Sequence, residues 1–180
     1  MVICYNCRRR GITMASSSAQ HHRKKAIICN YGTGGHAEQM RRLIAHIELS
    51  ELTLIAQSPT KPADKRYEEY SKIAKVRSEY TNVRDILALP FFACAGLIRT
   101  VKLFIRYDIR MLISTGPGVA IIPSIIAKIF GAKVIYFESW SRFSSPSIAG
   151  LIMYRIADVF FIQNEEIQKF YRKAHYMGRL

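Results

Sequence analysis

The sequence predicts an α/β fold in which helices cover both faces of a parallel sheet. Short apolar runs alternate along the chain with segments whose apolar residues recur at helical spacing, a pattern typical of a parallel sheet with crossover helices. Two of the runs end in glycine-rich turns, at residues 32–36 and 114–118. The 180 residues are enough for one domain with a sizeable core. We therefore predict a Rossmann-like, doubly wound sheet that binds a phosphate-bearing ligand at the carboxyl ends of its strands.

The expected strands are short apolar runs rich in β-branched and aliphatic residues. They cover residues 26–30, 52–56, 73–77, 111–114, 133–137 and 159–163. The expected helices have apolar residues every three or four positions, as at Met40, Leu43, Ile44 and Ile47. They cover residues 38–49, 86–98, 119–130, 148–156 and 165–172, with one helical turn at residues 67–70. One of the serines around Pro146 is expected to cap the helix at residues 148–156.

The segment at residues 86–98 has two interpretations. Its 13 uncharged residues are followed by basic residues within residues 99–110. The run is too short to cross a bilayer as a helix, but an apolar helix with basic residues close behind suits the plane of an anionic membrane surface. It is equally typical of a crossover helix packed on the sheet. Both can hold if one face packs and another meets lipid.

The formal net charge of +14 restricts the possible partners. Residues 1–25 hold six basic residues and no acid, and we expect them to form a flexible basic tail before a globular domain at residues 26–180. The domain is basic as well, which suits an anionic membrane, a phosphorylated substrate or nucleic acid, or reflects only a soluble basic surface. Aromatic residues are not interleaved with basic ones on one element, so we expect no nucleic-acid partner.

The cysteines do not predict a metal site or a cofactor. Cys4 and Cys7 form a CxxC pair, but no second pair at metal-binding spacing accompanies them. Cys29 lies in an expected buried strand and Cys94 in an apolar helix, so we expect both to be small core residues. The sequence contains no Asp-x-Asp motif, and we expect no metal dependence and no cofactor.

The turn at residues 32–36, which reads GTGGH, is the first candidate for ligand binding. Its glycines allow a close approach of the backbone to a ligand, and the first amides of the next helix can face an anion. The spacing fits a dinucleotide fingerprint weakly, because no acid follows the strand at residues 52–56 to hold a ribose. His36 at the helix start is expected to be a neutral proton acceptor, or else a capping or packing residue.

Glu138 directly follows the expected strand at residues 133–137. A carboxylate at the carboxyl end of a strand lies on the ligand edge of such a sheet. There it could act as a general base or bind a sugar hydroxyl, or it could cap a helix or pair with Arg142. The second glycine turn, with Gly116 and Gly118, is either a second anion site or only a tight turn.

Six motifs in a fixed order resemble one protein family. They read GTGGH from residue 32, STGPG from 114, ES from 138 with a nearby arginine, SPS from 145, YRIAD from 154 and YMGRL from 176. From about residue 25 to 180, the chain resembles the acceptor-side subunits of split GT-B glycosyltransferases. These include the membrane-anchoring subunit of the eukaryotic dolichol-linked N-acetylglucosaminyltransferase, and bacterial capsule and exopolysaccharide subunits of the PssD and CpsF type.

The resemblance implies the N-terminal half of a GT-B fold and one chain of a two-chain inverting glycosyltransferase. A partner subunit would bind the nucleotide sugar, and this chain would hold a polyprenyl-diphosphate-linked sugar acceptor at the cytoplasmic face of the cell membrane, in capsule or exopolysaccharide synthesis. The transfer would be hexosyl, N-acetylhexosaminyl or glucuronosyl. His36 and Glu138 would be the catalytic candidates. The acceptor and its diphosphate would be bound by Gly32, Thr33, Gly34, Gly35, Gly116, Gly118 and Arg142.

One departure separates this sequence from the eukaryotic subunit that it resembles. That subunit has an N-terminal transmembrane helix, and we expect none here, which favours a bacterial member attached peripherally through residues 86–106 and its positive charge. The main alternative is a non-catalytic membrane scaffold or enhancer of a separate glycosyltransferase. A Rossmann-type oxidoreductase and a nucleic-acid-binding protein are further alternatives.

Overall fold

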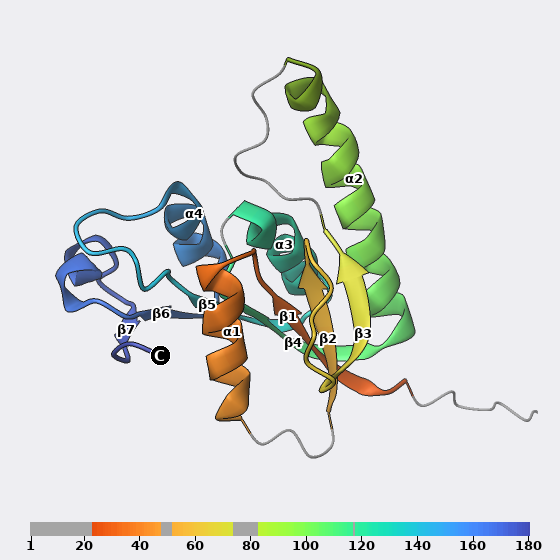
Figure 1. Ribbon diagram of the computed structural model, residues 1–180, viewed down its shortest axis with the longest axis horizontal. Helices are drawn as coiled ribbons and strands as arrows, with labels where there is room; N and C mark the ends of the chain where they lie inside the picture. Colours follow the sequence, from red (N-terminus) through yellow and green to blue (C-terminus); the bar gives the residue numbers. More distant parts are fainter. Residues whose placement is uncertain (1–22, 48–51, 74–82, 117) are drawn as a thin grey trace, which may run out of the picture.

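The chain folds around one parallel sheet (Figure 1). The structure is a computed structural model that describes residues 23–47, 52–73, 83–116 and 118–180. Its seven strands lie in the order β3-β2-β1-β4-β5-β6-β7, and all neighbours are parallel. The strand order reverses between β1 and β4, which is the switch point of a doubly wound sheet. The predicted α/β, Rossmann-like fold is confirmed.

The elements alternate along the chain as the sequence indicates. The strands are β1 (Lys25–Asn30), β2 (Thr53–Ser58), β3 (Tyr67–Lys72), β4 (Asp108–Ser114), β5 (Lys133–Phe137), β6 (Val159–Ile162) and β7 (His175–Tyr176). The α-helices are α1 (Gly35–Ala45), α2 (Val83–Arg106), α3 (Ile121–Ile129) and α4 (Ile148–Ile156). Two 3-10 helices complete the described chain, η1 (Gly118–Ala120) and η2 (Glu165–Phe170).

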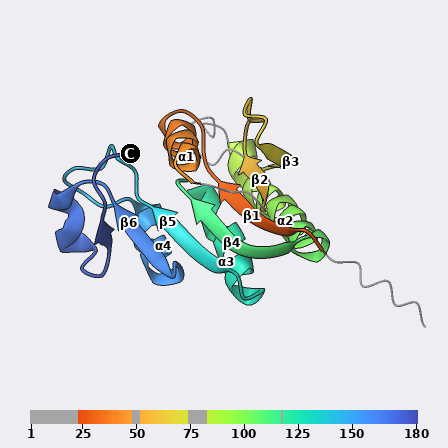
Figure 2. The same cartoon turned by 90° about the horizontal axis from the view of Figure 1, so that it is seen from below.

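The two faces of the sheet are covered by different numbers of helices (Figure 2). In the described part of the chain, α1 lies on one face, and α2, α3 and α4 lie side by side on the other. Successive residues of β1 point to opposite faces. Ile28 therefore joins the core under α2–α4, whereas Ile27 and Cys29 join the core under α1. A strand buried on both faces reads as a continuous apolar run, which is what residues 26–29 show.

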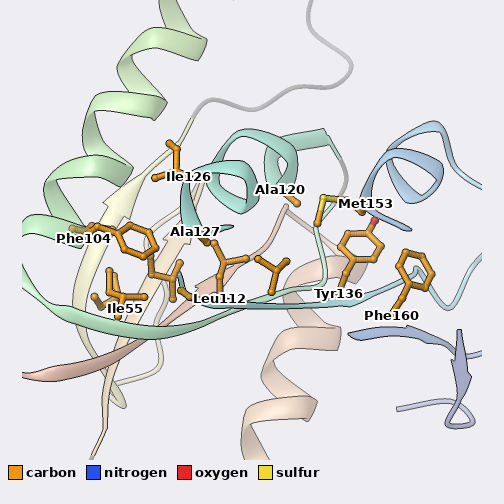
Figure 3. Close-up of a cluster of buried hydrophobic side chains, with 14 of the residues drawn as sticks. Ile55, Phe104, Leu112, Ala120, Ile126, Ala127, Tyr136, Met153 and Phe160 are labelled. Atoms are coloured by element: carbon orange, nitrogen blue, oxygen red, sulfur yellow. The ribbon is translucent and has the colours of Figure 1, made fainter. Parts of the chain in front are cut away.

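The larger core ties α2, α3 and α4 to the middle of the sheet (Figure 3). The sheet contributes Leu112, Tyr136 and Phe160, and all three are buried. The helices contribute Phe104 from α2, Ile126 and Ala127 from α3, and Met153 from α4. Fully burying a large apolar side chain contributes about 1.5–3 kcal/mol, so this layer anchors the strands whose ends carry the candidate site.

The region after β2 differs from the sequence-based prediction. Residues 67–70, expected as a helical turn, belong to strand β3, which pairs with β2 along one side only. The glutamates and the lysine of β3 mask the apolar pattern by which a strand is predicted from sequence. An edge strand exposes part of its surface and commonly carries charged residues. The strand predicted at residues 73–77 would begin at Ile73, but Ile73 lies after the end of β3 and outside any strand, so the prediction is wrong there. Residues 74–77 lie outside the described residues.

Helix α2 is longer than the apolar run predicts. It continues through the basic residues to Arg106, because Thr100, Leu103 and Phe104 repeat at helical spacing and are buried against the rest of the fold. Cys94 on this helix is exposed, so its expected role as a core residue is wrong, whereas Cys29 is buried as expected. Among the described helices, none combines the length and the hydropathy needed to cross a bilayer.

At both ends of the fold, the observed elements differ from the predicted boundaries. Residues 1–22 of the expected tail lie outside the described residues. Lys25 already belongs to β1, and the backbone N–H of Asp108 donates to the carbonyl of Lys24 at 3.0 Å. At the other end, β7 was not expected, and the helix expected at residues 165–172 is the 3-10 helix η2. Helix α4 has the expected bounds, and Ser147 caps it as expected.

Candidate active site at the carboxyl edge of the sheet

The first glycine turn connects β1 to α1 and leaves backbone amides for a ligand. Gly34 is the N-cap of α1 and has φ 63° and ψ −127°, a conformation that essentially only glycine adopts. Its carbonyl accepts hydrogen bonds from the N–H groups of Ala37 and Glu38 at 3.0 and 3.1 Å, which starts the helix. No acceptor among the described residues meets the amides of Thr33, Gly34 or Gly35. These amides and the helix dipole can therefore bind an anion.

His36 joins the two glycine turns across the switch point. Its Nδ1 lies 2.5 Å from the carbonyl oxygen of Thr115, and the Thr115 hydroxyl donates to the carbonyl of His36 at 2.8 Å. A carbonyl oxygen can only accept, so Nδ1 carries the proton and the lone pair of the neutral imidazole is on Nε2. The half-buried ring is thus held at the helix start in a defined tautomer.

A buried polar chain fixes the strand ends under these turns. Ser114 Oγ donates to Asn30 Oδ1 at 3.2 Å, and Asn30 Nδ2 donates to Gln57 Oε1 at 3.0 Å. Gln57 Nε2 then donates to Thr100 Oγ1 of α2 at 2.8 Å. All four side chains are buried, and such groups are costly to bury unless they are paired. The chain therefore locks β1, β2, β4 and α2 together at the ligand edge.

Gly116 is tightly packed at this point. A methyl group on its Cα would lie 3.2 Å from both Asn30 Oδ1 and Val119 Cγ2. Its N–H donates to Ser114 Oγ at 3.0 Å, so this amide is already bonded within the protein. Gly118 opens η1, and Pro117 between the two lies outside the described residues. The second glycine turn thus lies close to the first glycine turn, but the amide of Gly116 is not available to a ligand.

Glu138 follows β5 and is enclosed, with 1% of its surface exposed. Its Oε2 accepts from the Tyr171 hydroxyl at 2.7 Å, and its Oε1 accepts from the backbone N–H of Ser139 at 3.0 Å. The Ser147 hydroxyl lies 3.1 Å from both carboxylate oxygens. Burial, and then the hydrogen bond to Glu138, raise the pKa of Tyr171, and the charge of Arg142 offsets part of that rise. Tyr171 is therefore a neutral donor at physiological pH.

The loop at residues 139–147 extends from Glu138 toward the first glycine turn. Trp140 Nε1 would lie 3.5 Å from a methyl group on Gly35, so the indole lies against the start of α1. The guanidinium carbons of Arg42 and Arg179 lie 5.2 and 5.3 Å from the centroid of its ring. Asn164 Nδ2 donates to the carbonyls of Trp140 and Arg142 at 2.8 and 2.5 Å. The loop is thus attached at both ends and in the middle.

The predicted site residues therefore fall into two groups. The first contains the turn at residues 32–36, with His36 bound to Thr115 beside Gly116. The second contains Glu138 and the loop that carries Arg142, and no ion pair joins these two described residues. The sequence prediction missed Asn30, Gln57, Thr115 and Tyr171. Polar residues that end otherwise apolar strands were the available signal for Asn30 and Gln57.

Two other kinds of site find no support at this edge. β2 ends in Gln57 and Ser58, and the amide of Gln57 is bonded to Asn30 and Thr100. The position where a dinucleotide-binding fold has its ribose-binding acid is thus occupied by a bonded amide. Within the described ranges, no three histidine, cysteine or acidic side chains are grouped as metal ligands.

Solved structures place this fold among the N-terminal halves of GT-B proteins. A UDP-N-acetylglucosamine 2-epimerase is similar with a TM-score of 0.61 and 17% identity, over 83% of this chain and 45% of that one. MurG of Acinetobacter baumannii is similar with a TM-score of 0.56 and 14% identity, over 78% of this chain and 41% of that one. The chain spans less than half of either protein, and the likeness concerns the fold.

The sequence comparison identifies the family. The chain belongs to the Alg14-like oligosaccharide biosynthesis proteins, whose family profile matches residues 27–180. It is similar to UDP-N-acetylglucosamine transferase subunit ALG14 of Debaryomyces hansenii (28% identity, 86% of this chain and 75% of that one) and of Candida albicans (26%, 83% and 75%). The mouse subunit of the same name is 22% identical over 83% of this chain and 80% of that one.

Proposed function

We propose that this chain is the acceptor-side subunit of a two-chain inverting glycosyltransferase. It binds a polyprenyl-diphosphate-linked sugar at the carboxyl edge of its sheet, and a partner subunit binds the nucleotide sugar. The family, the half GT-B fold and the names of the similar transferase subunits support this assignment. The observation that carries it is the bond between His36 and Thr115, which places an oriented imidazole between two glycine turns.

The geometry suits His36 as the general base. Nε2 has the lone pair of the neutral ring, and it takes the proton of the acceptor hydroxyl as that oxygen attacks the anomeric carbon of the donor sugar. The bond from this carbon to the nucleotide breaks, and the nucleoside diphosphate leaves with the electron pair. The amides of Thr33, Gly34 and Gly35 bind the acceptor diphosphate, with Gly32, Gly116 and Gly118 allowing its close approach and Arg142 adding a positive charge at the edge.

The α2–α4 apolar surface supports attachment to an anionic membrane at its cytoplasmic face. It consists of exposed apolar side chains on the three helices that cover one face of the sheet, together with Phe130 directly after α3: Leu97, Ile98, Ile105, Ile125, Ile129, Phe130, Ile148, Leu151 and Ile152. Ile129 and Ile148 are 76% and 81% exposed, far more than is usual for large aliphatic residues. Arg99, Lys102 and Arg155 are exposed on the same helices. Apolar and basic side chains together suit a bilayer with anionic head groups.

Vesicle sedimentation tests the membrane assignment. We expect the chain to bind vesicles that contain anionic lipid and to bind neutral vesicles less. Replacing Ile129 and Ile148 together by aspartate should release the chain without lowering its melting temperature, because both side chains are exposed. Met177→Asp, at an exposed residue after β7, is the matched control and should keep binding. Unchanged binding of the double variant would contradict this surface as the lipid-facing one.

A transferase assay tests the activity. Membranes that contain this chain, its nucleotide-sugar-binding partner, both or neither are given labelled nucleotide sugars, and label is followed into organic-extractable lipid. We expect incorporation only with both chains, loss of incorporation with His36→Ala, and normal incorporation with His46→Ala at an exposed position on the end of the same helix. Incorporation by the partner alone would contradict the proposal.

The nucleotide sugar that the enzyme uses as donor tests which sugar is transferred and in which biosynthetic setting. Transfer from UDP-N-acetylglucosamine is the activity named for the similar subunits. Transfer from a glucose, galactose or glucuronate donor onto a bacterial polyprenyl-diphosphate sugar would instead support the capsule or exopolysaccharide setting expected from the sequence.

A non-catalytic scaffold is the second candidate, favoured by the α2–α4 apolar surface, which needs no chemistry in this chain. The two candidates differ in the effect of His36→Ala. A scaffold keeps its partner bound and the transfer rate unchanged, whereas a catalytic subunit keeps its partner bound and loses the rate.

A further inference from the structure

We propose that Glu138 is a positioning residue and not the base. Together with Ser147, Gly150 and Tyr171 it forms a clamp, the Glu138 clamp, that holds the loop at residues 139–147 against the first glycine turn. The effect on turnover rests on the proposed function, but the effect on the loop can be measured without it.

The carboxylate of Glu138 has no room for a substrate. Both oxygens accept hydrogen bonds from Ser147, one also from Tyr171 and the other from the backbone of Ser139. A general base must come within hydrogen-bond reach of the proton that it removes. An enclosed carboxylate whose oxygens already accept from three donors within the protein is shielded from that role.

Gly150 closes the remaining side of the clamp. A methyl group on its Cα would lie 1.8 Å from Glu138 Oε2 and 2.4 Å from the Tyr171 hydroxyl. The N–H of Gly150 also donates to Ser147 Oγ at 2.8 Å, so Ser147 caps α4 and binds the carboxylate at the same time. The start of α4, the end of β5 and Tyr171 after η2 therefore meet at one carboxylate.

The consequence lies in the loop between the two clamped ends. Ser139 and Ser147 are bonded to the carboxylate, and these are the first and last residues of the loop. Trp140 within it lies against Gly35, and Arg142 is bonded through its carbonyl to Asn164. If the clamp opens, Trp140 should move away from the glycine turn beside His36. The clamp thus acts on the site through the loop, without touching the reacting atoms.

The single tryptophan of the chain reports on this loop directly. Fluorescence of the purified full chain is measured for Glu138→Gln, Tyr171→Phe and Gly150→Ala, without partner or substrate. We expect a red shift of the Trp140 emission and stronger quenching by acrylamide in all three. Gly96→Ala, in α2 where an added methyl group meets nothing within 4 Å, and Tyr176→Phe, at an exposed tyrosine, should leave the emission unchanged. Unchanged emission in Glu138→Gln and Tyr171→Phe would overturn the clamp, whatever the activity.

Turnover with the partner subunit separates positioning from base chemistry. For a clamp, kcat falls by about 10- to 100-fold in Glu138→Gln and by a similar factor in Tyr171→Phe, because the site is displaced, and the pH profile keeps its shape. A much larger loss confined to Glu138→Gln, with normal emission and loss of one limb of the pH profile, would identify Glu138 as the base and overturn the inference. If Gly150→Ala fails to fold by circular dichroism, Ser147→Ala, which removes only one hydroxyl, takes its place.

Discussion

The carboxyl edge of the sheet holds two polar clusters that differ in their access to solvent. The cluster around His36 is built from backbone turns, and amides of the glycine turn meet no acceptor in the described chain. The cluster around Glu138 is closed, because side chains and backbone occupy both carboxylate oxygens. Two polar clusters at the same edge of a sheet can therefore differ in whether the surrounding packing leaves their groups accessible to a ligand.

The largest expected effect is at the open cluster. His36→Ala removes the proposed base, and we expect kcat to fall by about 10²- to 10⁴-fold while the partner still binds. The measurement is single-turnover transfer with both chains present, and His46→Ala is the control. A rate within a factor of a few of the wild type would make the open cluster a binding site only.

The polar chain beneath the turns should have the next largest effect. Asn30→Ala removes the donor to Gln57 Oε1 and the acceptor of the Ser114 O–H, and each group left unsatisfied costs about 1–3 kcal/mol. Chemical denaturation should show this loss of unfolding free energy, whereas Thr60→Ala, at an exposed position, should change it little. Equal stability of Asn30→Ala and wild type would contradict the role of the chain in fixing the strand ends.

The closed cluster should show a smaller loss when only its cap is removed. Ser147→Ala deletes the N-cap of α4, and loss of such a cap costs about 0.5–2 kcal/mol, while the Tyr171 hydroxyl and the Ser139 N–H still bind the Glu138 carboxylate. The melting temperature measures this, with Ser141→Ala in the same loop, where the side chain is exposed, as the comparison. A loss no larger than that of Ser141→Ala would mean that the clamp does not depend on this hydroxyl.

The smallest expected effect lies on the surface beside the open cluster. Hydrogen bonds from Arg41, and then from Arg42, lower the pKa of Glu38 from 4.5 to about 2. The ion pairs therefore add stability above pH 4.5, and this contribution is lost as the pH falls from 4.5 to about 2. Glu38→Gln should lower the melting temperature slightly at pH 7, less near pH 2 and not at all well below pH 2. High salt should reduce the difference, because the group is exposed.

The sequence-based prediction succeeded best in the interior. Residues 26–30, 133–137 and 148–156 lie in elements close to those expected, because apolar periodicity reports burial and burial defines these elements. It failed at residues 67–70, where an edge strand is polar and takes its conformation from pairing with β2. It also assigned Cys94 to the core, because composition does not say which side of a helix faces the sheet.

For the candidate site, the sequence by itself determined the places where the backbone must turn. Gly34 could be identified because its position between a strand and a helix demands a conformation available to glycine, and the structure has it at φ 63°. Only the tertiary structure decided that His36 bonds to Thr115, 79 residues away, and that Tyr171, 33 residues from Glu138, closes the carboxylate. Local sequence specifies local dihedral angles, whereas contacts between distant strand ends exist only once the sheet order has formed.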